Sequence, residues 1–122
     1  MALRGVRGAT TIAMDNQENV LAATRELLQT IQRANPDLKT LDIGSAFFTT
    51  TADITSAFPA AAARGIGWDH VPMICTNEIP VSDSLPMCIR VLILWNTDQA
   101  QDSIQHIYLR EAKKLRPDLI NN

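Results

Sequence analysis

The chain has 122 residues, of which 46% are hydrophobic and 20% are charged, and its formal net charge at pH 7 is -2. These values indicate one globular domain, residues 1–122, and the absence of a basic cluster argues against nucleic acid as a partner. No apolar run is long enough to span a membrane and no signal peptide is evident, so we expect a cytoplasmic protein with reduced thiols. The two cysteines and two distant histidines lack metal-ligand spacing, so we expect no metal and no other cofactor.

Residues 2–12 predict the first strand. On strand alternation Arg7 shares a face with Leu3, Gly5 and Ala9, and therefore stands among small neighbours. Glycines in a strand are costly unless another group approaches the backbone closely, so Gly5 and Gly8 suggest such an approach. Taken alone, Arg7 is better explained as a solvated arginine on an edge strand.

Residues 16–34 predict the long helix of the fold. Asp15 or Asn16 can cap it, and the Asn35-Pro36 pair ends it. Its apolar stripe has the spacing of a core-facing helix and consists of Val20, Ala23, Leu27, Leu28 and Ile31. Residues 44–50 then predict a second strand, after which we expect Asp53 to cap a short helical segment.

The second half of the chain predicts shorter elements. In order they are a helix at 58–64 ending with Arg64, a strand at 70–76, a loop at 80–87, a central strand at 88–95, a strand at 104–109 and a helical turn at 110–116. Pro72 favours an edge position for the strand at 70–76, because proline cannot donate to a sheet. Pro117 begins a C-terminal tail that we expect to be mobile.

The longest apolar run, residues 88–95, predicts a central strand that is buried on both faces. One charge interrupts it: alternation points Arg90 the same way as Cys88, Leu92 and Leu94. A guanidinium cannot lose its proton, and burying it costs several kcal/mol unless an anion meets it. That anion could be an internal Asp or Glu, or a negatively charged ligand, and the strand by itself leaves both open.

These elements define an α+β fold, with one mixed β-sheet of about five strands packed on one long helix. A single helix cannot cover both faces of such a sheet. We therefore expect copies of the chain to bury the second face, in a closed homo-oligomer with pockets between subunits.

The candidate functional residues are Arg7, Arg64, Arg90, Cys75, Glu78 and Tyr108. They form neither a Ser-His-Asp set nor a carboxylate pair, neither histidine stands in the context of a general base, and no nearby cation would activate Cys75. The set is instead rich in fixed donors. It suits a small polyanion that is held in one shape, so that position and electrostatics do the chemistry.

Segments spread over nearly the whole chain carry a family resemblance. They are residues 4–11 (Arg-Gly-Val-Arg-Gly-Ala-Thr-Thr), Phe58-Pro59-Ala60 with Arg64, Gly67-Trp68, Val71-Pro72, Cys75, Glu78, residues 88–91, residues 106–109 and residues 115–119 (Leu-Arg-Pro-Asp-Leu). By this ordered set the chain resembles the AroH-class chorismate mutases, the trimeric α/β type. It departs from them at Ala61 and Ala62, where relatives often carry a lysine, and between Arg64 and Trp68, where it is one residue short.

The resemblance implies a cofactor-free pericyclic isomerisation of chorismate to prephenate, in the route to Phe and Tyr. It also implies a homotrimer resembling an α/β barrel, with sites between subunits. In such a site Arg90 would be catalytic, donating to the ether oxygen of the breaking bond. Arg7 and Tyr108 would bind a substrate carboxylate, and Cys75 and the catalytic Glu78 would contact the ring hydroxyl region, with Ile74 as a further substrate-binding residue. Phe58 and Arg64 would come from the neighbouring chain. Leu115 and Arg116 would belong to a tail that closes over the site.

Two other functions fit the same residues. One is a non-catalytic trimeric domain that binds an anionic metabolite through its arginines, and the other is an interface deaminase in which Cys75 or Glu78 positions water. A deaminase would depend on an acid or base that titrates near neutrality. A mutase needs neither, so its rate should vary little around pH 7.

Overall fold

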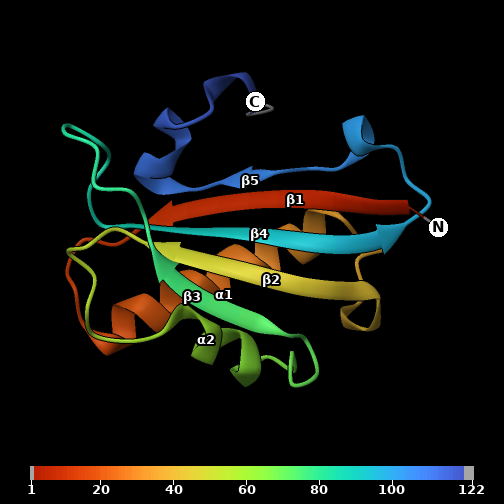
Figure 1. Ribbon diagram of the computed structural model, residues 1–122, viewed down its shortest axis with the longest axis horizontal. Helices are drawn as coiled ribbons and strands as arrows, with labels where there is room; N and C mark the ends of the chain where they lie inside the picture. The colour runs from red at the N-terminus through yellow and green to blue at the C-terminus, as the bar shows by residue number, and fades with distance from the viewer. Residues whose placement is uncertain (1, 120–122) are drawn as a thin grey trace.

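The computed structural model describes residues 2–119, in which all five strands join one mixed sheet of order β3-β2-β4-β1-β5 (Figure 1). The strands are β1 (Ala2–Thr11), β2 (Ile43–Thr50), β3 (Met73–Asn77), β4 (Cys88–Thr97) and β5 (Ile107–Tyr108). β4 runs antiparallel to both β1 and β2, whereas the outer strands β3 and β5 pair in parallel with their neighbours. The architecture is therefore the α+β class with a five-stranded mixed sheet that the sequence predicts.

Two helices, α1 (Gln17–Ala34) and α2 (Pro59–Gly65), lie behind the sheet as it is viewed in Figure 1, so the cover is not a single helix. Four short 3₁₀ segments complete the described chain: η1 (Thr40–Asp42), η2 (Gln101–Ser103), η3 (Arg110–Lys114) and η4 (Pro117–Leu119). None of the helices within residues 2–119 combines the length and apolar character needed to cross a bilayer.

Helix α1 forms where its capping and apolar pattern predict it. The Asn16 side chain accepts a hydrogen bond of 2.8 Å from the backbone N–H of Asn19, which satisfies an otherwise unpaired donor of the first turn. The buried face of the helix is the predicted stripe together with Thr24. At the other end the Asn35 side chain donates to the carbonyl oxygens of Ile31 and Gln105, which ties the helix end to the segment before β5.

Strand β4 alternates between the two faces of the sheet. Ile89, Val91, Ile93 and Trp95 are buried toward the helices, whereas Arg90, Leu92 and Asn96 are exposed on the other face. The prediction that this strand is buried on both faces is therefore wrong for the single chain. The physical reason is that α1 and α2 both pack on the same face (Figure 1). On the opposite face, hereafter the open face, the segment that contains Ala112 and Leu115 packs only on the end near Cys88.

Three further predictions need correction. No helix begins at Asp53; its carboxylate instead accepts hydrogen bonds from the Met87 backbone N–H and the Thr51 hydroxyl and so joins the end of β2 to the start of β4. The last strand covers only Ile107–Tyr108, because only Gly8 and Ala9 of β1 pair with it. The helical turn expected at 110–116 is the 3₁₀ segment η3, which begins at Arg110 with a left-handed φ of 54°. The edge position of β3, predicted from Pro72, is confirmed.

Gly8 allows α1 to lie close against β1. A Cβ atom at this position would come within 2.7 Å of Ile31 Cδ1 and 3.1 Å of Leu27 Cδ1, both on the buried stripe of the helix. The close approach that the sequence suggests for this glycine is therefore confirmed, and the approaching group is the core face of α1.

We predict that Gly8→Ala destabilises the fold by roughly 1–3 kcal/mol, because the added methyl group overpacks the contact between β1 and α1. Urea unfolding followed by circular dichroism measures this change. Gly65→Ala is the control, since an added Cβ there meets nothing within 4 Å and the free energy of unfolding should hardly change. Equal stability of Gly8→Ala and the wild type would contradict the packing argument.

Candidate active site

Strand register assembles the site on the open face. Arg90 of β4 lies opposite Ala9 of β1 on one side and opposite Thr49 of β2 on the other, and Ala9 pairs in turn with Tyr108 of β5. Paired residues point to the same face of a sheet, so Tyr108, Ala9, Arg90 and Thr49 form one row across four strands. The small side chain of Ala9 leaves space between the arginine and the tyrosine.

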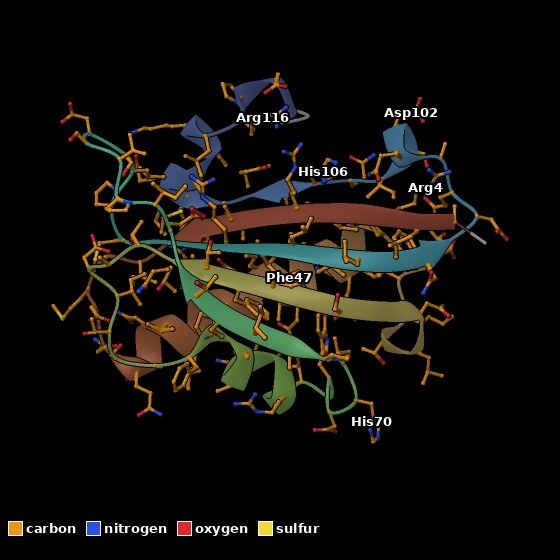
Figure 2. The ribbon with its side chains drawn as sticks, viewed as in Figure 1. Arg4, Phe47, His70, Asp102, His106 and Arg116 are labelled. Atoms are coloured by element: carbon orange, nitrogen blue, oxygen red, sulfur yellow. The ribbon has the colours of Figure 1, made fainter. Side chains whose placement is uncertain are left out.

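A second row lies directly beside the first. Arg7 pairs with Leu92, Leu92 pairs with Phe47, and Phe47 pairs with Ile74 at the edge of the sheet. Figure 2 shows Phe47 on the face turned toward the viewer, with His106 and Arg116 at the β5 edge. The two rows set the guanidinium-bearing residues Arg7 and Arg90 on adjacent strands of one surface.

This surface holds a cavity of about 360 Å³, which falls in the range of small-molecule sites. Six of the predicted site residues line it: Arg7, Glu78, Arg90, Tyr108, Leu115 and Arg116. They come from both ends of the chain and from its middle. The structure therefore brings three of the four predicted arginines and the predicted carboxylate together around one cavity.

Arg90 meets an internal carboxylate at the cavity wall. Its Nε lies 3.5 Å from Oε1 of Glu78, and the side chains are 44% and 26% exposed, respectively. The Thr49 hydroxyl donates a hydrogen bond of 2.8 Å to the same Glu78 oxygen. A partly exposed ion pair at this distance is a weak constraint, so the Arg90 guanidinium can still bind a ligand anion.

The Arg7 side of the cavity is held by His106. The Arg7 backbone N–H donates a hydrogen bond of 2.9 Å to His106 Nδ1, so this nitrogen must be unprotonated. Burial, reinforced by the Arg7 and Arg116 charges, lowers the pKa of His106 below its usual value. His106 is therefore a neutral structural acceptor and not a general base, which agrees with the sequence analysis.

Arg116 enters the cavity from the C-terminal segment. Its guanidinium forms two hydrogen bonds with the Asp118 carboxylate, of 3.1 and 2.8 Å, which lowers the pKa of that carboxyl group. Leu115 of the same segment packs against the cluster formed by Ala9, Cys88 and Tyr108. The segment thus lies across the β5 side of the cavity within the single chain.

The structure does not bring the other four predicted residues into this cavity. Ile74 lies on the open face but is 57% exposed at the sheet edge. Cys75 pairs with the buried Phe48 and packs against the core, so its thiol is on the helix face, where it lines a separate cavity with Phe58. Phe58 is 71% exposed at the start of α2, and Arg64 is exposed at its end.

The thiol nearest to Arg90 is Cys88, which the sequence analysis treated only as a neighbour on the strand. It is buried between Ala9, Tyr108 and Ala112. Burial raises the pKa of the Cys88 thiol, and the Arg90 charge offsets this only in part. A buried protonated thiol is a poor nucleophile, so nucleophilic chemistry has no support here.

Sequence reasoning missed Thr49 and Phe47, which also line the cavity. Alternation within residues 44–50 does place both on one face. What it could not supply is the pairing of that face with Arg90 and Leu92, because pairing between strands far apart in sequence is a tertiary property. No local signal identified Thr49 as the partner of Glu78.

Fold and site together define an α+β protein with a small, cation-rich cavity, whose lining within residues 2–119 includes no activated nucleophile. The family model for chorismate mutase type I matches residues 3–119, and the chain belongs to this family. The chain is similar to "Chorismate mutase AroH" of Thermus thermophilus, with 52% identity over 117 residues that cover 96% of each chain. It is also 42% identical to "Chorismate mutase AroH" of Bacillus subtilis (strain 168) over 120 residues, which cover 98% of this chain and 94% of the relative.

A solved structure agrees with this assignment. The chorismate mutase from Clostridium thermocellum superposes with a TM-score of 0.88 at 43% sequence identity, covering 90% of this chain and 97% of that chain. The family predicted from sequence motifs is therefore confirmed, and the fold is shared with a chorismate mutase of known structure.

The lowered pKa of His106 predicts how stability depends on pH. The unfolded chain binds a proton near pH 6.5, whereas the folded protein binds it only at lower pH. This contribution to the free energy of unfolding is therefore fully present above pH 6.5 and is lost as the pH falls through the lowered pKa. We expect urea unfolding to show this loss of stability as the pH falls from about 6.5 through the lowered pKa of His106.

The variant His106→Asn keeps an acceptor for the Arg7 N–H but cannot be protonated, so its loss over this pH interval should be smaller. His70→Asn is the matched control, because His70 is exposed and lies far from His106 in Figure 2. An unchanged pH dependence in His106→Asn would contradict the assignment.

Proposed function

We propose that the protein isomerises chorismate to prephenate at the cavity of the open face, with Arg90 as the residue that stabilises the transition state. As a chorismate mutase the protein is an isomerase of aromatic amino acid biosynthesis. The observation that carries the site assignment is the row formed by Tyr108, Ala9, Arg90 and Thr49. It sets a permanently charged guanidinium in the wall of a small cavity beside a second arginine, Arg7.

The proposed mechanism is positional and electrostatic. A concerted rearrangement needs no acid, base or nucleophile, only a substrate folded so that its reacting carbons meet. Arg7, Tyr108 and Arg116 would hold the two substrate carboxylates and so remove the conformational freedom that opposes the reaction. Leu115 would close the cavity, and Glu78 would accept a hydrogen bond from the ring hydroxyl.

Arg90 is the residue that would accelerate the reaction. The ether oxygen of the breaking bond gains negative charge only in the transition state. A fixed guanidinium at that oxygen therefore binds the transition state more tightly than the substrate, which is what acceleration requires. Its partly exposed ion pair with Glu78 is weak, so the guanidinium is free to bind a ligand oxygen as well.

We further propose that the working assembly is a homotrimer. The open face exposes Leu3, Phe47, Ile74 and Leu92, which are between 36% and 58% exposed in the single chain and would be covered by a second copy. Phe58 and Arg64 stand exposed away from the chain's own cavity and would enter that of a neighbour. Each site would then combine residues of two chains, with Ile74 and the Cys75 backbone at the boundary.

The cytoplasm is the proposed compartment, because both cysteines are free thiols. An interface deaminase would need Cys75 or Glu78 to position water. The Cys75 thiol lies on the helix face, so the deaminase gains no support from the geometry.

Substitution of Arg90 tests the mechanism. We expect Arg90→Lys to lower kcat by about 10²–10³-fold, because an ammonium group lacks the rigid planar fork. Citrulline introduced at position 90 by semisynthesis keeps the shape and removes the charge, and we expect a loss at least as large. The assay is the decrease of chorismate absorbance in the absence of any cofactor.

Arg25→Lys on the exposed face of α1 is the control and should keep wild-type activity. Full turnover with citrulline at position 90 would overturn the electrostatic mechanism. A wild-type protein that leaves chorismate unchanged at micromolar concentration would overturn the proposed function.

Mixing inactive variants tests the shared site. Arg90→Ala and Arg64→Ala should each be nearly inactive, yet heterotrimers refolded from an equal mixture should regain activity. Half of the chains would supply Arg90 and half would supply Arg64, so about one site in four would be complete. If both residues serve a site within one chain, mixing will restore nothing.

A further inference from the structure

We propose that Thr49 is a positioning residue for the reaction: its hydroxyl fixes the Glu78 carboxylate, and through it the geometry between Glu78 and Arg90. The inference rests on the proposed function of this cavity and adds a residue to it. Thr49 lies on β2, directly opposite Arg90 in the row across the open face, and it lines the cavity.

Glu78 needs such a constraint because it follows directly after β3, which is an edge strand of the sheet. Its backbone N–H donates a hydrogen bond of 2.9 Å to the Thr50 carbonyl oxygen, which fixes the main chain at this point. The side chain beyond it still has three rotatable bonds. Its ion pair with Arg90, at 3.5 Å and partly exposed, is too weak to select one rotamer.

Thr49 supplies the stronger constraint. Its hydroxyl donates a hydrogen bond of 2.8 Å to Glu78 Oε1, and hydrogen bonds to charged groups are the stronger class. The donor is itself rigid, because Thr49 is β-branched and belongs to a strand paired on both sides. Adjacent residues of β2, Thr49 and Thr50, therefore hold both the side chain and the backbone of Glu78.

The geometry also assigns the two carboxylate oxygens different roles. The hydrogen bond from Thr49 and the ion pair with Arg90 both use Oε1. Oε2 then stays available to accept a hydrogen bond from a substrate hydroxyl. Without Thr49 the carboxylate could rotate, and either oxygen could meet Arg90 or turn toward solvent.

Two variants distinguish a positioning role of Thr49 from a purely structural one, because the two roles predict opposite orders of activity. Thr49→Val keeps the β-branched shape and suits a strand, but it removes the hydroxyl. Thr49→Ser keeps the hydroxyl and is the poorer strand former. If Thr49 only supports the sheet, activity follows stability and the valine variant is the better enzyme. If Thr49 positions Glu78, the serine variant is the better enzyme although it is the less stable.

The experiment measures kcat and KM for chorismate together with urea unfolding. We expect Thr49→Val to lower kcat/KM about tenfold with stability retained, and Thr49→Ser to stay within about twofold of the wild type. In a Glu78→Ala background, Thr49→Val should cost less than about twofold, because the group it positions is gone. Thr76→Val is the matched control: it lies beside Thr49 in the same row, and within residues 2–119 its hydroxyl makes no hydrogen bond to Glu78.

Wild-type activity in Thr49→Val, or an equal loss in both backgrounds, would overturn the inference. So would an equal loss in Thr76→Val. If Glu78→Ala is impaired and Thr49→Val is not, only this inference fails. If Glu78→Ala itself retains full activity, the error lies in the proposed site.

Discussion

The antiparallel pairing of β4 with both β1 and β2 is the constraint on which the site depends. One register sets Arg90 opposite Ala9, and another sets it opposite Thr49. Because side chains alternate between faces, a shift of one residue in either pairing would send Arg90 toward the helices or its partners away from it. The buried residues of β4 prevent such a shift, since Ile89, Val91, Ile93 and Trp95 all have to face the core.

The two faces of the sheet differ in role: one forms the core and the other carries the site. The helix face is a packed core in which α1 lies so close to β1 that only a glycine fits at position 8. The open face carries arginines, hydroxyl groups and partly exposed apolar side chains. Packing on the helix face fixes the backbones of the strands, and the same strands carry the site residues on the open face. The positions of these residues are therefore set largely by the core.

The titratable groups near the cavity are held in inert states. Burial keeps the Cys88 thiol protonated, and burial with two neighbouring cations keeps His106 neutral. Neither state helps acid-base or nucleophilic chemistry. Both suit a reaction that requires a fixed arrangement of positive charge, because an added proton on His106 would break its hydrogen bond to β1 and disturb Arg7.

The amino-acid sequence by itself determined the elements whose signals are local. The cap and stripe of α1, the apolar run of β4 and the edge position of β3 were all readable from neighbouring residues, and the ordered motifs identified the family. Six of the ten predicted site residues indeed line one cavity. Local patterns failed at Asp53, which accepts from Met87 across a gap of 34 residues, and they extended the last strand beyond its two paired residues.

Only the tertiary structure decided which face each strand buries and which residues become neighbours. The prediction that β4 is buried on both faces was wrong because both helices pack on one side. The pairing of Thr49 with Arg90, the turn of the Cys75 thiol toward the core and the burial of Cys88 near Arg90 all follow from strand register. Register is fixed by long-range packing of the whole sheet, and that information is not contained in any short stretch of the chain.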